Sequence, residues 1–239
     1  FYFFKTPRGK YLLGLASPGG AGRNKTLGQN EFSRLKITIP PTEEQKKIAK
    51  ILYTWDRANE KLEVLISAKQ KRKKALMQQL LTGRKRFAGF EGEWRKVRIG
   101  EIAHIETGSS KSEHINDIGD KFIVDMGAIS RDGKFIPSKR TSITTDYLEV
   151  GQLVMPKDDI GGGNIIGRTA YIDQGMKYVL GDHVFKLTIT DGCSLFIHYL
   201  INHETVNKNL RRKANGTAQS GLSKKDVIKQ VIFVPLDIM

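Results

Sequence analysis

The clearest chemical pattern in the sequence is a glycine-rich stretch at residues 162–169, which ends in Gly-Arg-Thr. Its spacing imitates a phosphate-binding P-loop in which Arg168 replaces the usual lysine, and such a loop would cradle a nucleotide. A P-loop must open a helix, however, and the residues after Thr169 have the pattern of a strand and a turn. We therefore interpret this stretch as a glycine turn between strands rather than as a site of nucleotide hydrolysis.

A second pattern consists of two carboxylates and a lysine: Asp120, Asp132 and Lys134. This set could hold a hydrated magnesium ion, as in metal-dependent nucleases. Asp132 and Gly133 are also the residue pair most typical of a tight hairpin, and they separate two short apolar runs. The hairpin is the favoured interpretation, and a nuclease site is the alternative.

Residues that bind transition metals are sparse in this sequence. His198 and His203 lie five apart, which does not place them on one face of a helix, and Cys193 has no CxxC companion. The sequence also lacks a dinucleotide-binding fingerprint and the Asn/Asp-Pro-Pro-Tyr/Phe motif of base methylation. We therefore predict no catalytic residue, no metal and no cofactor. The single cysteine fits a reducing compartment, and we expect a cytoplasmic protein.

The charge of the chain favours binding instead. Lys and Arg number 40 against 25 Asp and Glu, a net charge of +15 over 239 residues. Such an excess indicates a polyanionic partner, nucleic acid ahead of an acidic membrane surface, and no apolar run is long enough to span a membrane. Four polar loops could approach phosphates and base edges: 107–112, 131–140, 161–168 and 211–220. For any one loop the alternative is a solvated basic surface.

A long helix is predicted to organise these loops. Residues 42–83 contain strong helix formers and no proline, and Thr42 with Gln45 has the spacing of a capping box. Gly83 suits the left-handed position that follows a last turn. At about 1.5 Å per residue the helix would be roughly 60 Å long. An ordinary core helix is one interpretation, but an apolar stripe of this length favours a coiled-coil spacer between two domains. The stripe comprises Ile48, Ile51, Leu52, Trp55, Ala58, Leu62, Leu65, Ile66, Leu76 and Leu80.

A second domain is predicted to begin at Trp94, after a basic linker at residues 84–93. It contains short β-like runs separated by turn formers, followed by a helix at 194–213. The runs cover residues 96–105, 122–126, 135–136, 152–155, 169–172 and 183–188. Residues 1–40 are too short to form a domain alone, and we interpret them as the end of a domain whose front is absent.

The end of the chain repeats its beginning. Residues 215–235 align with residues 20–40 at an offset of 195, which matches Leu222 with Leu27 and Ile232 with Ile37. A repeat of this length predicts a duplicated domain, each copy followed by a long helix, rather than a solenoid.

Several of these stretches together resemble one known family. VRIGEIAHIETG (97–108), LEVGQLVMPKDDIGGGNIIGRTAYID (148–173) and NGTAQSGLSKKDVIKQVIFVPL (215–236) are similar to the target recognition domain of type I restriction-modification specificity subunits. PPTEEQKKIAKILYTWD (40–56) and ALMQQLLTGRKRFAGFEGEW (75–94) are similar to the helical spacer of that family and its exit. Gln152 stands where Asp is common in the family. In this family two recognition domains each read half of a split DNA site.

The resemblance implies an α+β fold, with a mixed α/β target recognition domain joined to a long coiled-coil spacer helix. It divides the chain into the end of a first recognition domain (1–40), the spacer helix (42–83), a linker (84–93), a target recognition domain (94–236) and the start of a second helical region (237–239). The implied partners are double-stranded DNA, methyltransferase subunits and, through the complex, restriction subunits. It also implies no catalysis by the chain itself.

The residues expected to be enriched in DNA contacts come from the polar loops and the segment after them. They are Lys111, Arg131, Lys134, Lys139, Arg140, Asn164, Arg168, Thr217, Gln219 and Lys224. The expected partner-helix interface is Ile48, Leu52, Trp55, Leu62 and Ile66, through which two copies of the chain could pair antiparallel. The alternative function is a non-catalytic structural adaptor whose long helix docks other proteins.

Overall fold

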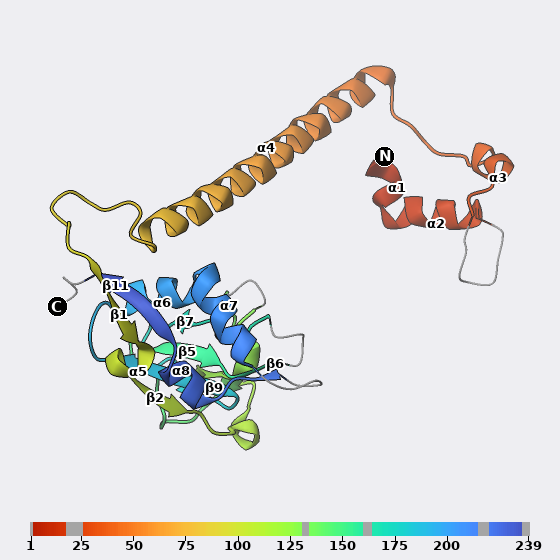
Figure 1. Ribbon diagram of the computed structural model, residues 1–239. Helices are drawn as coiled ribbons and strands as arrows, with labels where there is room; N and C mark the ends of the chain where they lie inside the picture. Colours follow the sequence, from red (N-terminus) through yellow and green to blue (C-terminus); the bar gives the residue numbers. More distant parts are fainter. Residues whose placement is uncertain (1, 18–25, 131–133, 160–163, 215–219, 236–239) are drawn as a thin grey trace. The chain divides into compact units, whose positions relative to one another are not determined.

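The chain divides into two compact units in the computed structural model, residues 1–68 and 69–239, with the boundary inside the long helix α4 (Figure 1). The structure describes residues 2–17, 26–130, 134–159, 164–214 and 220–235. Their mixed helix and strand content is the α+β class that the sequence predicts. Among these residues, no helix is both long and apolar enough to cross a membrane.

The described residues of the first unit form three short helices and the first part of α4. The short helices are α1 (Tyr2–Lys5), α2 (Pro7–Leu15) and α3 (Gln29–Ser33). Thr6 separates α1 from α2 because its side chain accepts a hydrogen bond from the backbone N–H of Gly9, which caps the second helix. The hydroxyl of Tyr2 donates to the carboxylate of Asp56 on α4, and this bond joins α1 to the long helix.

Helix α4 (Thr42–Leu80) has 39 residues, and none of them is buried. Gly83 has φ +70°, the predicted left-handed conformation, and the helix ends three residues before it. The predicted capping box does not form. The helix begins at Thr42 itself, and the backbone N–H of Gln45, from which the Thr42 side chain would have to accept a hydrogen bond, donates to the carbonyl of Pro41 at 3.0 Å. The side chain of Gln45 instead donates to the carbonyl of Pro40 at 2.7 Å.

In the second unit the described residues form four small sheets. An antiparallel sheet in the order β2-β9-β5-β7 forms its centre, and a three-stranded sheet in the order β4-β3-β8 lies beside it. Two strand pairs, β1-β11 and β6-β10, complete the set. The strands are β1 (Trp94–Arg98), β2 (Ala103–Thr107), β3 (Lys121–Val124), β4 (Arg140–Thr141), β5 (Leu153–Pro156), β6 (Asp158–Asp159), β7 (Ala170–Tyr171), β8 (Tyr178–Leu180), β9 (Val184–Ile189), β10 (Ser220–Gly221) and β11 (Val231–Pro235).

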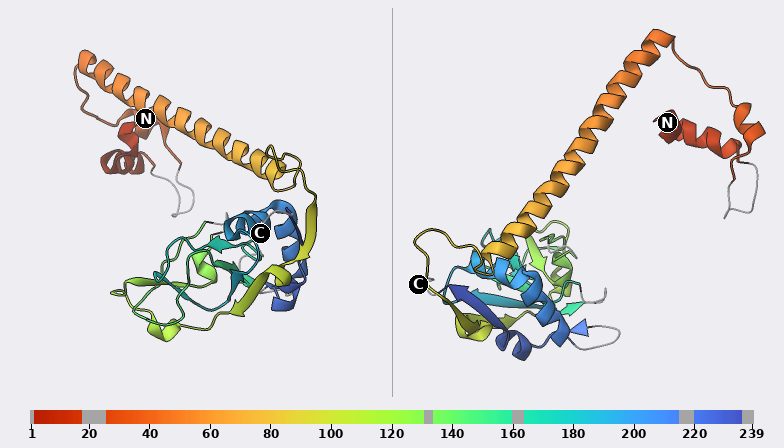
Figure 2. Two further views of the ribbon diagram at one scale, coloured as in Figure 1. Left: turned by 90° about the vertical axis from the view of Figure 1, so that its left-hand side faces the viewer. Right: turned by 45° about the horizontal axis from the view of Figure 1, so that its top comes forward.

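Within the part of this unit that the structure describes, four α-helices and two short 3₁₀ turns accompany these sheets. They are α5 (Ile99–Ile102), α6 (Ser194–Asn202), α7 (Glu204–Lys213) and α8 (Lys224–Ile228), with η1 (Ser112–His114) and η2 (Met126–Ala128). Helices α6 and α7 lie on one side of the central sheet (Figures 1 and 2). Ile197, Ile201 and Leu210 on these helices belong to the same buried cluster as Leu153 and Leu187 on the sheet, so one core joins them.

Two predicted elements are interrupted in the structure. The single helix expected at 194–213 breaks at His203, whose backbone is extended at ψ 140° and which joins α6 to α7. The strand expected at 96–105 is divided by the short helix α5. Ile99 and Ile102 of α5 are both buried, so a helical turn places two isoleucines in the core where an alternating strand would bury only every second residue.

The predicted repeat corresponds to a repeated structure. Helices α3 and α8 begin and end at positions that the alignment pairs, Gln29 with Lys224 and Ser33 with Ile228. The helix pair α1–α2 likewise precedes α3 as α6–α7 precedes α8. The surroundings differ, because β11 pairs with β1 whereas the matching residues 36–40 form no strand.

Candidate nucleic-acid interface

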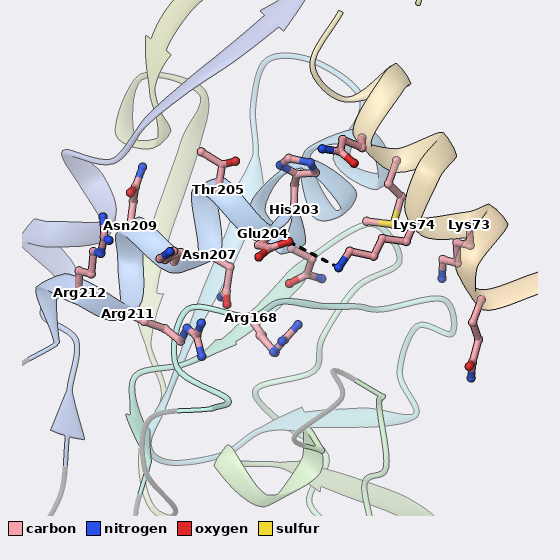
Figure 3. A pocket seen from close by; sticks show the side chains of 15 residues that line it. Lys73, Lys74, Arg168, His203, Glu204, Thr205, Asn207, Asn209, Arg211 and Arg212 are labelled. Atoms are coloured by element: carbon pink, nitrogen blue, oxygen red, sulfur yellow. Dashed lines mark ion pairs between the residues drawn. The ribbon is translucent and has the colours of Figure 1, made fainter. Parts of the chain in front are cut away.

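Two of the predicted polar loops meet at helix α7. They line a cleft of about 850 Å³ within the second unit, which we call the basic cleft. Its walls come from the end of α4, the turn at Arg168 and the length of α7 (Figure 3). Among the described residues, six cationic side chains line it against a single carboxylate, that of Glu204: Lys73, Lys74, Arg168, Lys208, Arg211 and Arg212.

Arg168 owes its place in the cleft to a tight turn. Gly167 has φ +68°, a conformation that favours glycine, and a Cβ built on it would lie 2.8 Å from the Cβ of Leu210 on α7. The turn therefore packs directly against α7. The Nε of Arg168 donates to the carbonyl of Asn164 at 3.1 Å, which orients the guanidinium.

Polar side chains fix the floor of the cleft. The backbone N–H of Thr169 donates to Oδ1 of Asn202 at 2.8 Å, and Nδ2 of Asn202 donates back to the carbonyl of Thr169 at 2.9 Å. Nδ2 of the buried Asn207 donates to the carbonyl of Ile166 at 3.2 Å. These bonds tie the turn to α6 and α7 at both ends.

His198 lies beneath the same floor. Its Nδ1 is 3.0 Å from the hydroxyl of Thr169. Burial, together with the positive charge of Lys73, lowers the pKa of His198 from 6.5 to about 4. The imidazole is therefore neutral near pH 7 and adds no charge to the cleft.

Acidic side chains are scarce around the cations of the cleft, and among the described lining residues Glu204 is the single carboxylate. Lys74 lies 3.8 Å from Glu204, and both side chains are largely exposed. Lys73 lies 5.7 Å from the centre of the Tyr199 ring. Figure 3 shows Lys74 reaching from α4 towards Glu204, and Arg168 and Arg211 extending on the same side of α7. Within the described part of the chain, no carboxylate lies in ion-pair distance of Lys208, Arg211 or Arg212.

The two other predicted loops meet elsewhere in the second unit. They line a smaller cavity of about 290 Å³, which we call the polar pocket, where Lys111 from residues 107–112 and Lys139 from residues 131–140 lie together. Lys111 pairs with Asp146 at 2.6 Å, and Lys139 pairs with Asp125 at 2.5 Å. The charge of this pocket is thus balanced, unlike that of the basic cleft.

A histidine completes the polar pocket. His183 lines it and has φ +61°, an unusual conformation for a residue other than glycine. Its Nδ1 lies 2.6 Å from a carboxylate oxygen of Asp158. Asp158 in turn lies 3.2 Å from the ammonium of Lys157. The pocket therefore offers hydrogen-bond donors and acceptors in fixed positions.

The other predicted contact residues lie apart from these two cavities. The guanidinium of Arg140 lies 5.6 Å from the centre of the Phe122 ring, and Lys134 and Lys224 are exposed. Asn164 accepts the hydrogen bond from Arg168 described above. Arg131, Thr217 and Gln219 lie outside the described residues.

Five cations of the basic cleft were not among the predicted contact residues. They are Lys73, Lys74, Lys208, Arg211 and Arg212. The signal available in the sequence was the spacing of Lys208, Arg211 and Arg212, which places all three on one face of a helix. That signal does not reveal which other elements this face meets.

The described part of the glycine-rich stretch that imitates a P-loop, residues 164–169, forms turns and no helix, as predicted. Strand β7 (Ala170–Tyr171) follows Arg168 where a P-loop would require a helix. The hairpin predicted around Asp132 is also supported by its stem: Ile129 bridges Phe135 antiparallel, and the N–H of Ser130 donates to the carbonyl of Lys134 at 2.9 Å. Asp132 itself lies outside the described residues.

A family model and a curated relative both place the chain in one family. The model of the type I restriction modification DNA specificity domain matches residues 1–70 and 91–237. The type I restriction enzyme MjaVIII specificity subunit of Methanocaldococcus jannaschii is 31% identical over 211 residues, which covers 79% of this chain and 48% of that subunit. The chain thus spans about half the length of this relative.

Solved structures share the fold at low sequence identity. A structure determined to explain complex assembly and conformational transition of the type I R-M system matches 95% of this chain and 56% of its own, with TM-score 0.56 and 20% identity. The HsdS subunit from Thermoanaerobacter tengcongensis matches 95% of this chain and 55% of its own, with TM-score 0.50 and 21% identity. From the family match and the fold together, the chain belongs to the type I restriction modification DNA specificity domain family.

Proposed function

We propose that this chain binds double-stranded DNA and reads part of its sequence, as a specificity component of a type I restriction-modification system. The observation that carries the proposal is that described residues of four polar loops, scattered along the sequence, meet in two cavities of one domain. Membership of a family described by its DNA specificity, and the net charge of +15, support it.

The two cavities suit different parts of a duplex. Sequence is read through patterns of donors and acceptors on base edges, and the polar pocket offers both from Lys111, Asp125 and His183. Phosphates carry charge without sequence information, and the basic cleft offers mainly cations. We therefore assign base reading to the polar pocket and the loops around it.

Titration of a pool of random duplexes at two salt concentrations tests the proposal. Binding should weaken steeply as salt rises, because cations that contact phosphates release counterions. A subset of sequences should be retained at the higher concentration. Equal affinity for every duplex would contradict sequence reading, and no binding even at low salt would favour an adaptor that docks other proteins.

Chemistry on the DNA is proposed to come from partner subunits. The relatives are subunits of restriction enzymes, and we propose that this chain has no catalysis of its own and directs methyltransferase subunits, and through them restriction subunits, to the site. Mixing the chain with a methyltransferase subunit of the same system should produce methylation of the selected duplex. Methylation by the chain alone would contradict this division.

The long helix is proposed to pair with another helix. All but one of the predicted interface residues are exposed: Ile48, Trp55, Leu62 and Ile66. Burying an apolar side chain of this size is worth about 1.5–3 kcal/mol, so an unpaired stripe is costly in water. We propose that a second copy pairs with it antiparallel, which would present two identical recognition domains to a palindromic target.

A further inference from the structure

We propose that the basic cleft between the end of α4 and α7 is a docking site for the phosphodiester backbone of a duplex, separate from the surface that reads bases. This inference rests on the proposed DNA binding and assigns one part of it to a cleft whose lining includes Lys73, Lys74 and Lys208, which belong to none of the predicted polar loops. The chemistry it requires is a row of phosphate oxygens spaced along an extended ligand.

The arrangement of charge on α7 fits such a ligand. Lys208, Arg211 and Arg212 stand at i, i+3 and i+4, so one face of the helix presents all three. Arg168 and Lys73 face them from other elements of the same cleft. Guanidinium groups pair with phosphate through two parallel hydrogen bonds, which makes arginine the residue best suited to hold it.

The cleft is also preorganised, because contacts within the protein hold its walls in place without a ligand. The turn that carries Arg168 is fixed by its contact with Leu210 and by the hydrogen bonds of Asn202 and Asn207 to the backbone. A site held in this way loses little conformational entropy on binding. The side-chain amides of Asn202 and Asn207 are already engaged in these hydrogen bonds. A ligand in the cleft would therefore be bound mainly by its cationic side chains.

Glu204 distinguishes a phosphate site from a general basic surface. Its carboxylate is the single negative side chain that the described residues bring to the cleft, and it lies 3.8 Å from Lys74. An approaching phosphate is repelled by Glu204 and competes with it for Lys74. Removing this charge should therefore tighten phosphate binding, whereas a carboxylate elsewhere on the domain should have no such effect.

Lys208→Gln and Glu204→Gln are the main variants. Both positions are exposed, so the protein should stay folded, and an unchanged thermal midpoint verifies this. The controls are Lys96→Gln and Glu113→Gln, which remove the same charges at exposed sites that line neither cavity. Affinity for several duplexes of different sequence is measured over a range of salt.

Lys208→Gln should weaken binding of every duplex by a similar factor, roughly threefold to tenfold. It should also reduce the slope of log affinity against log salt by about one, the signature of one lost phosphate contact. Glu204→Gln should strengthen binding of every duplex by a similar factor and steepen that slope. The two control variants should behave as the wild type does.

Three outcomes would overturn the inference. Unchanged affinity and slope in both variants would show that the cleft does not meet the backbone, while the proposed DNA binding would stand. A change confined to one base pair would assign the cleft to base reading. Polyglutamate that binds the wild type more tightly than duplex does, and loses this in Lys208→Gln, would assign it to an acidic protein.

Failure of the proposed function gives a different result. If the wild type binds all duplexes equally but the variants change as expected, sequence reading is wrong and the backbone site stands. If the wild type binds no duplex at low salt, both are wrong.

Discussion

Single residues decide whether the basic cleft exists. Arg168 reaches α7 only because Gly167 adopts φ +68° directly against Leu210, a position where a side chain would meet the Cβ of that leucine. Thr169, Asn202 and Asn207 then hold the turn through hydrogen bonds to backbone groups. Neutral residues beneath the cleft therefore determine whether the positive charge of Arg168 lies in it.

Gly167→Ala should destabilise the protein by about 2–4 kcal/mol. The left-handed backbone costs a residue with a Cβ about 1–3 kcal/mol, and the contact at 2.8 Å adds an overpacking cost. Chemical denaturation measures the loss. Gly89→Ala is the matched control, because Gly89 has φ +83° with open space around it, and it should lose only about 1–2 kcal/mol. Equal losses would show that the contact with Leu210 is unimportant.

His198 should make stability depend on pH between about 6.5 and 4. Its pKa is lowered from 6.5 to about 4 in the folded protein, so the unfolded chain takes up the proton first as pH falls. Stability is complete above pH 6.5 and declines by about 1–3 kcal/mol as pH falls to 4, after allowance for partial exposure. Urea unfolding of wild type and His198→Gln at pH 7.5 and 4.5 measures it. The variant should lose less stability over this range, and an identical loss would contradict a shifted His198.

At the scale of elements, α4 is a long helix whose apolar side chains are not buried by the rest of the chain. It has 39 residues, none of them buried, although its stripe contains large apolar side chains such as Trp55, which is 66% exposed. A helix with such a stripe is stabilised chiefly by packing against a partner. This is the physical basis for proposing a second helix alongside it.

Leu62→Asp should abolish self-association of the chain. A wild-type dimer at tens of micromolar should become a monomer in sedimentation experiments, because the substitution places a charge in the proposed interface. Val64→Asp is the matched control, since Val64 is 70% exposed on the same helix but lies off the stripe. A wild-type monomer whose sedimentation neither variant changes would contradict the pairing.

At the scale of the whole molecule, one sequence pattern occurs in two surroundings. Leu222, Val227 and Ile232 are buried in the second unit, whereas their repeat partners Leu27, Phe32 and Ile37 are exposed in the first. The difference follows from the sheet: β11 pairs with β1 and covers a core of more than a dozen residues, while residues 36–40 form no strand. The same sequence pattern therefore contributes buried side chains where a core and a partner strand are present, as in the second unit. It leaves the matching side chains exposed in the first unit.

Ile232→Ala and Ile37→Ala test this directly, because the repeat pairs these two isoleucines. Ile232 is 1% exposed, and its truncation should cost about 2–5 kcal/mol through lost burial and the cavity left behind. Ile37 is 44% exposed, and its truncation should cost less than about 1 kcal/mol. Chemical denaturation of the two variants gives both values, and equal costs would mean that Ile37 is buried in solution.

The sequence alone determined the features that depend on neighbouring residues. The long helix, the glycine turn at Gly167, the left-handed Gly83 and the repeat of α3 in α8 all follow from local periodicity, propensity and spacing. The ordered series of family motifs likewise indicated the DNA specificity family without any structure. The capping box at Thr42 was wrong because the helix already includes Thr42, and the backbone N–H of Gln45 that the box requires donates to the carbonyl of Pro41 instead.

Only the tertiary structure decided which charges act together. Lys73, Arg168 and Arg211 are far apart in the sequence and meet because the core brings the end of α4, one turn and α7 to the same place. Lys111 and Lys139, which carry the same charge in the sequence, meet Asp146 and Asp125 and are neutralised. Electrostatic interactions depend on distance in space, and the sequence specifies that distance only through the packing of the whole domain.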